Sequence, residues 1–388
     1  MKNICLIHSM GLFGNKVGGL ETYIRDFVTY CPNKYGLLFV GVATCSDDPV
    51  GVFYERQFNG RNVLLFNIMK AENDNISEAS SNIFNSLTFR FLLGLIKYNR
   101  KLSKFIKNNN YMVDLRRVEF SFFCVFNGIK FTQMLHGVGV PAGDTSSLLL
   151  RFKFVHNLFE RLAIKNCEYF FCVNKYKAEE LKHKYPLFDD RIGYIGTWAD
   201  KSIYKPIPFQ LNNIIDLSFV GRLENVKDPK LMFDVIKIIK NKNKHVRLHY
   251  VGPDDPSKIS GYSDIKDELI VYGYKTAKEI SDILSCVDIG ILFSHFEGMP
   301  RCIVEILSVG RPVVTTNFTG INELVNDRVN GFVSKSRDPH IIANMIIEVW
   351  GYIQQNKFEP TAISATVEKY SPSIQLKKVF SVIDSTGV

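Results

Sequence analysis

The sequence predicts an α/β protein with two Rossmann-like domains that face each other across a cleft. A chain of 388 residues is long for a single hydrophobic core and suits two domains. Short apolar runs alternate with helix-like segments almost throughout, which is typical of doubly wound sheets. The alternation is interrupted by a turn-rich stretch at 196–206 and restarts at Asp216. We therefore expect domains at 1–200 and 207–371, followed by a last helix within 372–388.

The first half contains six short apolar runs that we interpret as strands, at 4–8, 36–42, 63–66, 122–126, 131–135 and 169–173. Helices are expected at 20–30, which Pro32 would stop, and at about 175–184.

The second half repeats the pattern. Its predicted strands lie at 216–220, 246–251, 269–272 and 289–293. Its predicted helices lie at about 229–240, at 302–309 with Pro300 or Arg301 in the first turn, and at 372–383. Ligands of such sheets bind beyond the carboxyl ends of the strands, so we expect the functional residues there.

The composition argues against several classes of protein. Eight cysteines are scattered without a Cys-x-x-Cys pair, which favours reduced thiols in a cytosolic protein over a zinc site. No run approaches the ~18 apolar residues of a membrane span, and the first residues read as a strand rather than a signal peptide. We expect a cytoplasmic protein, soluble or peripheral on the inner face of the cytoplasmic membrane.

The net charge of +9 is concentrated in one segment. Apolar and basic residues are interleaved between residues 90 and 117, and a basic amphipathic helix of this kind can lie on an anionic membrane. The alternative is an ordinary helix that covers the first sheet with its charges solvated. A nucleic-acid partner is not expected, because no binding motif accompanies the patch. The basic residues are Arg90, Lys97, Arg100, Lys101, Lys104, Lys107, Arg116 and Arg117.

Two carboxylates, Glu297 and Glu305, stand eight positions apart around a predicted junction between a loop and a helix. Free backbone N–H groups at such a helix start attract anions. The pair therefore frames a ligand that is anionic in one part and rich in hydroxyls in another. A nucleotide sugar fits that description.

The segment Ser294-His295-Phe296-Glu297-Gly298-Met299-Pro300, followed by Glu305, resembles the Glu-x7-Glu signature of the retaining glycosyltransferases of family four, which have the GT-B fold. Helix surfaces carry many Glu pairs, so the spacing alone is weak evidence. The resemblance continues downstream in Gly310-Arg311-Pro312-Val313-Val314, Gly320-Ile321-Asn322-Glu323-Leu324 and Asn330-Gly331-Phe332-Val333.

The resemblance implies unequal roles for the two carboxylates. Glu305 would accept hydrogen bonds from the ribose diol of the donor, while Glu297 would contact hydroxyls of the transferred sugar. Gly298, Met299 and Pro300 would bring backbone close to that sugar and to the diphosphate. Two Glu residues could also be a glycosidase pair, but the phosphate-binding pattern around them would then have no purpose.

A second constellation, Gly221-Arg222-Leu223-Glu224-Asn225-Val226-Lys227, follows the predicted strand at 216–220. Cleavage of a sugar–phosphate bond leaves negative charge on phosphate, and Arg and Lys stabilise that charge. Two such cations in a loop can simply be solvated, but Arg222 and Lys227 match an Arg and a Lys of the family. Where the family often has Gly after the Lys, this chain has Asp228.

Four further residues, at three places in the chain, are candidate ligand contacts. Gly18 and Gly19 open the first helix, and the resemblance implies that this glycine loop faces the donor diphosphate; a flexible loop is the alternative. His136 follows a predicted strand and by resemblance lies near the transferred sugar, although a lone His is often structural. Tyr274 follows another strand, and backbone there would lie against the nucleobase.

Arg116, Arg117 and Glu119 are candidate acceptor contacts, with ordinary surface charge as the alternative. No Asp-x-Asp element stands where a metal–diphosphate bridge would be expected, so Arg222 and Lys227 could supply that charge and we expect no metal and no cofactor.

These features predict a retaining, metal-independent hexosyltransferase. Its donor would be a UDP- or GDP-sugar and its acceptor a glycan or lipid-linked glycan of bacterial surface polysaccharide, such as capsule or lipopolysaccharide. Two alternatives stay open: a nucleotide-sugar epimerase of the same fold, and a non-catalytic scaffold at a membrane surface.

Overall fold

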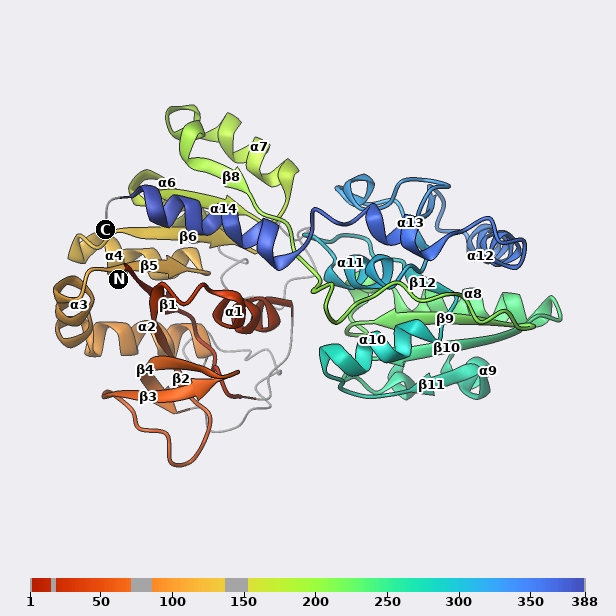
Figure 1. The fold of residues 1–388 in the computed structure, drawn as a ribbon, viewed down its shortest axis with the longest axis horizontal. Helices are drawn as coiled ribbons and strands as arrows, with labels where there is room; N and C mark the ends of the chain where they lie inside the picture. Colours follow the sequence, from red (N-terminus) through yellow and green to blue (C-terminus); the bar gives the residue numbers. More distant parts are fainter. Residues whose placement is uncertain (1, 15–18, 71–85, 137–152, 387–388) are drawn as a thin grey trace. The chain divides into compact units, whose positions relative to one another are not determined.

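Two α/β units make up the chain in a computed structural model that describes residues 2–14, 19–70, 86–136 and 153–386 (Figure 1). Unit 1 comprises Met1–Ile195 together with Leu376–Val388, and unit 2 comprises Gly196–Gln375. Each unit has its own sheet and its own hydrophobic core. The predicted fold class, two Rossmann-like domains with largely parallel sheets, is confirmed.

The sheet of unit 1 has the strand order β3-β4-β2-β1-β5-β6-β7-β8. All its neighbours are parallel except β3 and β4, which form an antiparallel hairpin at the edge. Asn59 and Gly60 join that hairpin with positive φ angles of 47° and 76°, as a type I′ turn requires. The strands are β1 Lys2–Ile7, β2 Tyr35–Ala43, β3 Phe53–Phe58, β4 Arg61–Lys70, β5 Tyr111–Leu115, β6 Phe131–Leu135, β7 Tyr169–Cys172 and β8 Ile192–Tyr194.

The helices of unit 1 cover this sheet with their apolar sides. In α2, for example, Phe91 and Leu95 are buried four positions apart, as one face of a helix requires. The helices are α1 Gly19–Tyr30, α2 Leu87–Lys97, α3 Asn99–Asn108, α4 Ser121–Asn127, α6 Lys153–Asn166 and α7 Lys175–Lys184.

The last helix, α14 (Pro372–Ser385), packs on unit 1 from Leu376 onward. The ring of Phe380 stacks on Tyr35 at 5.2 Å and lies 5.4 Å from Phe27. Asp384 accepts hydrogen bonds from Lys34 Nζ at 2.7 Å and from the Tyr35 hydroxyl at 2.8 Å. The end of the chain is thereby fixed to the unit in which the chain begins.

The sheet of unit 2 is entirely parallel, in the order β11-β10-β9-β12-β13-β14. Its central strands β9, β12 and β13 are buried along almost their whole length, as expected of a parallel sheet covered on both faces, although β9 includes Asp216 and Ser218 and β13 ends in two threonines. The strands are β9 Ile214–Val220, β10 His245–Val251, β11 Leu269–Val271, β12 Ile289–Leu292, β13 Val313–Thr316 and β14 Gly331–Ser334. The helices are α8 Pro229–Asn241, α9 Tyr262–Ile265, α10 Ala277–Ser285, α11 Arg301–Ser308, α12 Pro339–Gln354 and α13 Pro360–Ala365.

Two sequence-based predictions about unit 1 are wrong. The apolar run 122–126 is not a strand but lies in α4, which ends at Gly128 in a left-handed conformation. A short apolar run cannot distinguish the two, and here Phe123 and Cys124 are buried while Phe126 is 84% exposed. The segment 90–117 is not one helix, since α2 ends at Lys97, α3 follows, and the chain then enters β5.

In the described parts of the chain, no helix combines the length and apolar character needed to cross a membrane.

Candidate functional site

The loop between β9 and α8 carries the predicted cations of unit 2. Gly221 begins it with φ of 150°, and its N–H donates to the Val251 carbonyl at 2.9 Å. A Cβ at Gly252 would lie 2.1 Å from the Gly221 oxygen, so the next loop needs glycine to pass this close. Arg222 is half exposed, and its ion pairs with described residues are long, 3.5 Å to Glu224 and 4.0 Å to Asp254. Its guanidinium is therefore loosely held and accessible to an anion.

Lys227 and Glu297 form an ion pair although they stand 70 positions apart in the sequence. Lys227 Nζ lies 2.6 Å from Glu297 Oε1, and the Ser294 hydroxyl donates to the same oxygen at 2.7 Å. The two charged side chains are 16% and 15% exposed. Burial favours the neutral amine, but the charge and hydrogen bond of Glu297, together with other nearby groups, outweigh it and raise the pKa of Lys227, which is therefore protonated.

The start of α11 follows this pair in the chain. Pro300 is buried at the N-cap and provides no side-chain hydrogen bond to the first turn. Glu305 is 6% exposed and accepts from Arg301 Nε at 2.7 Å, one helical turn earlier. Burial raises the pKa of the neighbouring Cys302 thiol to about 12, so that side chain stays neutral beside the charged groups.

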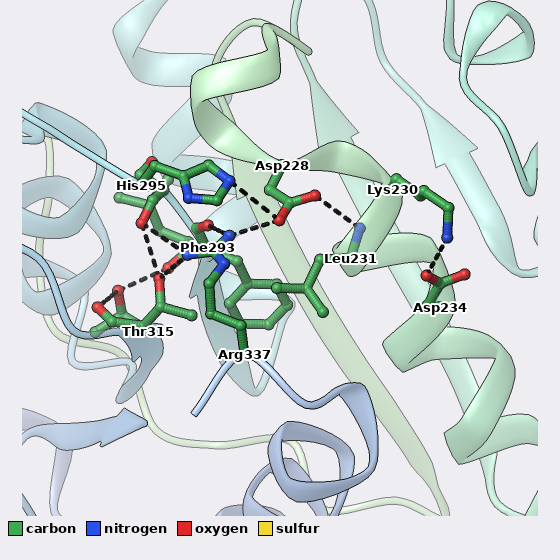
Figure 2. A network of polar contacts seen from close by, with 11 residues as sticks. Asp228, Lys230, Leu231, Asp234, Phe293, His295, Thr315 and Arg337 are labelled. Atoms are coloured by element: carbon green, nitrogen blue, oxygen red, sulfur yellow. Dashed lines mark hydrogen bonds and ion pairs between the residues drawn. The ribbon is translucent and has the colours of Figure 1, made fainter. Parts of the chain in front are cut away.

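Asp228 takes the place that glycine often holds in the family, and its backbone explains why. Its φ of 48° and ψ of 61° are left-handed, a conformation that Gly adopts freely and that Asp tolerates better than most residues. Its carboxylate also caps α8 by accepting from the Leu231 N–H at 3.1 Å, and it lies 2.6 Å from Arg337 (Figure 2). Asp228 therefore tolerates the left-handed backbone, and its carboxylate is paired with a helix N–H and a guanidinium.

The strand β11 is followed by Gly273, whose φ of 69° turns the chain and whose carbonyl accepts from the Gly252 N–H at 3.1 Å. The Tyr274 side chain is 55% exposed. This turn and the Gly221 loop both follow strands of the same parallel sheet, so their backbones lie at its carboxyl edge.

In unit 1, His136 directly follows β6, as predicted. Its ring packs edge-on against Tyr23 with centroids 4.8 Å apart, and Nε2 is buried without a hydrogen-bond partner in the described chain. Burial and the charges of Arg116 and Arg117 hold its pKa well below the ordinary value, so the imidazole is neutral at pH 7. Gly19 begins α1, whereas Gly18 lies outside the described residues.

The candidate acceptor contacts differ in exposure. Arg116 is buried and bound to Asp114 Oδ2 at 2.5 Å, with its guanidinium 4.7 Å from the Tyr23 ring centre. Glu119 is also buried, and Arg117 is half-buried. The surface-charge alternative is therefore wrong for Arg116 and Glu119.

The fold brings together the residues predicted from the second half of the chain. Lys227 and Glu297 touch, Gly221 and Arg222 share the Lys227 loop, and Gly298, Met299 and Pro300 link Glu297 to the helix of Glu305. Sequence reasoning missed Ser294 as a partner of Glu297, and it missed Asp254 and Arg337. Their signal was weak, since each is one polar residue in a loop that follows a strand.

Among the described residues, no group of three or more His, Cys, Asp or Glu side chains is placed to hold a metal ion.

Comparison with known proteins relates this geometry to a family. Residues 215–351, which contain all the unit 2 candidates, match the model of the glycosyl transferases group 1. The chain is 29% identical over 150 residues to the UDP-Gal:alpha-D-GlcNAc-diphosphoundecaprenol alpha-1,3-galactosyltransferase of Escherichia coli, covering 35% of this chain and 37% of that protein. It is 30% identical over 141 residues to the amylovoran biosynthesis glycosyltransferase AmsK of Erwinia amylovora, covering 34% of each. The aligned stretch thus spans about a third of these relatives.

The fold has close counterparts over its whole length. The structure of Anabaena Alr3699/HepE in complex with UDP and glucose matches with a TM-score of 0.72 at 16% identity, over 99% of this chain and 100% of that one. At this identity the similarity establishes the fold alone.

Proposed function

We propose that this chain transfers a hexosyl unit from a UDP- or GDP-sugar with retention of configuration, because its residues 215–351 match the group 1 glycosyl transferases, the family that the Glu-x7-Glu resemblance predicted. The acceptor in this proposal is a glycan or lipid-linked glycan of a bacterial surface polysaccharide. The observation that carries the proposal is the contact between Lys227 and Glu297, which joins a phosphate-binding cation to a sugar-binding carboxylate.

The cations do the electrostatic part of the reaction. When the bond between the sugar and the β-phosphate breaks, negative charge grows on the phosphate oxygens. Lys227 is protonated and largely shielded from water, so its charge is less screened than that of a surface lysine. Arg222 is loosely held and can turn its fork of N–H groups toward the same diphosphate. Together they supply charge without a metal ion.

The carboxylates orient the donor. Lys227 Nζ and the Ser294 hydroxyl both donate to Oε1 of Glu297 and so fix its carboxylate. The other oxygen of the carboxylate then has a defined position for the hydroxyls of the transferred sugar. Glu305, buried in α11, is the candidate for the ribose diol. The uncapped start of α11 offers backbone N–H groups to the diphosphate, and the turn at Tyr274 offers backbone to the base.

In this proposal neither carboxylate acts as a nucleophile. The departing phosphate accepts the proton of the acceptor hydroxyl as the new bond forms on the same face of the sugar. His136 and Gly19 of unit 1 are candidates for contacts to the sugar and the diphosphate. The neutral His136 would donate or accept one hydrogen bond there without adding charge.

A membrane-bound acceptor is favoured by the surface of α2 and α3. Leu93 and Ile96 are 52% and 59% exposed, and Lys97, Arg100 and Lys104 of the same two helices are exposed as well. Exposed apolar groups next to cations suit the surface of an anionic bilayer. We propose that this face holds the enzyme at the cytoplasmic membrane, where lipid-linked acceptors lie.

The deciding experiment is a screen of UDP-, GDP- and other activated sugars. We expect one nucleoside diphosphate to raise the melting temperature and its sugar derivative to be hydrolysed slowly without acceptor. NMR of the product formed with an added acceptor should show the anomeric configuration of the donor. Conversion of the donor to an epimer without any acceptor would point to an epimerase. A folded protein that no activated sugar stabilises would refute the donor site.

A further inference from the structure

Arg337, in the loop after β14, joins two loops of unit 2 (Figure 2). Its Nη2 donates to Asp228 Oδ2 at 2.6 Å and to the Phe293 carbonyl at 2.7 Å. Its Nη1 donates to the Ser294 carbonyl at 3.3 Å and reaches Thr316 Oγ1 at 3.4 Å. One guanidinium thus binds the residue that starts α8 and the end of β12 together.

Asp228 is held from both sides of this junction. Its Oδ1 is used by the α8 cap, which leaves Oδ2 to Arg337 and to His295 Nε2 at 3.4 Å. The His295 N–H also donates to the Val226 carbonyl at 2.8 Å, a second tie between the same two loops.

Lys227 immediately precedes Asp228, and Glu297 follows Ser294 by three residues. The distance of 2.6 Å between Lys227 Nζ and Glu297 Oε1 therefore depends on how the two loops are held. We propose that Arg337 is a positioning residue, which acts through Asp228 and the Phe293 and Ser294 carbonyls to place Lys227 against Glu297. Its consequence for transfer rests on the function proposed above, whereas its effect on Lys227 does not.

The chemistry of the side chain suits this role. The guanidinium is planar and always charged, and it donates in several fixed directions at once. Lysine could reach Asp228 but could not hold the carbonyls in the same geometry. The solvent-accessible pair of Lys230 and Asp234, which begins in the first turn of α8, also measures 2.6 Å but joins residues of the same helix only. Lys230→Gln is therefore a matched control that removes a nearby cation without releasing a loop.

The first test needs no donor. Lys227 in the folded protein is labelled with trace acetic anhydride, and the labelling rate is read by mass spectrometry. In Arg337→Gln and in Asp228→Asn, which keeps an oxygen for the α8 cap, we expect Lys227 to react several-fold faster than in the wild type. In Lys230→Gln its rate should not change. An unchanged Lys227 rate in folded Arg337→Gln would overturn the proposal.

The second test uses the UDP- or GDP-sugar that the wild type turns over. A shift of about 1 Å in a reacting group can cost about 100-fold, so Arg337→Gln should lower kcat by about 10- to 100-fold. The donor KM should stay within about threefold, because the loss falls on the transition state. Arg337→Lys should recover part of kcat. In a Lys227→Ala background, Arg337→Gln should cost less than about twofold, since its target is gone.

The outcomes separate the two proposals. A full, additive loss in the Lys227→Ala background would show that Arg337 acts elsewhere and would overturn the inference. If no donor is turned over by the wild type, the proposed function fails, while Lys227 labelling still decides whether Arg337 positions it.

Discussion

Replacement of Lys227 by methionine removes the ammonium group and keeps most of the apolar stem, so it isolates the charge. Loss of one donor to a developing oxyanion costs roughly 2.7–4 kcal/mol, or about 10²–10³ in kcat. Lys227 should fall in this range, because it is 16% exposed and protonated, and water screens it little. The donor KM should change much less than kcat, since the extra charge that Lys227 neutralises develops only in the transition state.

The same substitution also affects stability, and this effect must be separated from catalysis. Without Lys227, Glu297 keeps Ser294 as a donor but is a largely buried charge without a cation, which should cost roughly 1–3 kcal/mol of unfolding free energy. The double variant Lys227→Met/Glu297→Gln removes both charges and should regain most of that stability without regaining activity. Steady-state kinetics with the identified donor and urea unfolding of the wild type and both variants provide the comparison. A folded Lys227→Met with wild-type kcat would refute the role of Lys227 as the phosphate-stabilising cation.

Three further variants test the fold and the surface. Burial raises the pKa of Asp288 to about 6 from 3.8, so the folded state holds more protons than the unfolded chain between about pH 4 and 6 and loses stability as the pH rises through that window. Asp288→Asn can still accept from the Asp216 N–H, so its unfolding free energy should exceed that of the wild type by an amount that grows across this window to about 3 kcal/mol at pH 7. Urea unfolding at several pH values measures this difference, and a difference that does not change with pH would contradict the prediction. Arg311 is fully buried and donates to the carbonyls of Ile207, Pro208 and Ser285, so Arg311→Met should lower the unfolding free energy by roughly 2–4 kcal/mol; a cost below about 1 kcal/mol would show that these carbonyls find other donors. The third variant changes Lys97, Arg100, Lys101 and Lys104 of α2 and α3 to Glu. It should no longer float with vesicles that contain anionic lipid, while its donor hydrolysis should not change. Flotation equal to that of the wild type would exclude membrane binding by this face.

Four strands and two helices of unit 2 could be predicted closely from their apolar patterns, whereas α10, α12 and α13 were not predicted. The expected strand at 246–251 and helix at 229–240 correspond to β10 and α8 within one residue at each end. The short strands β13 and β14 were recognised only as family motifs, since four residues carry little periodicity. Burial on both faces makes a central strand easy to recognise.

Unit 1 was harder for a physical reason. The run at 122–126 is as apolar as a strand but is a helix, because one side packs on the core and Phe126 faces water. The strand β5 was not predicted, because it lies within a segment rich in basic residues. Its residue Asp114 is charged and is nevertheless buried, because it pairs with Arg116. Charge that is neutralised inside the fold has no signature in local sequence.

The candidate site likewise has a part that the sequence could predict and a part that it could not. That Lys227 and Glu297 lie at one site could be anticipated, because both residues belong to motifs that follow strands, and parallel strands bring such loops to one edge; their direct ion pair was not predicted. Arg337 could not, since it supports the site through Asp228 and two carbonyl oxygens, and carbonyls carry no sequence identity. Asp228 stands where the family often has glycine. Glycine would satisfy the left-handed backbone at this position, but only a carboxylate can also bind Arg337 from a distant loop. If the contact between Asp228 and Arg337 is what the site requires, then Asp228→Gly should preserve the backbone of the loop and still lower kcat, as Arg337→Gln is expected to do. A glycine variant with wild-type kcat would instead mean that the backbone conformation at this position is sufficient.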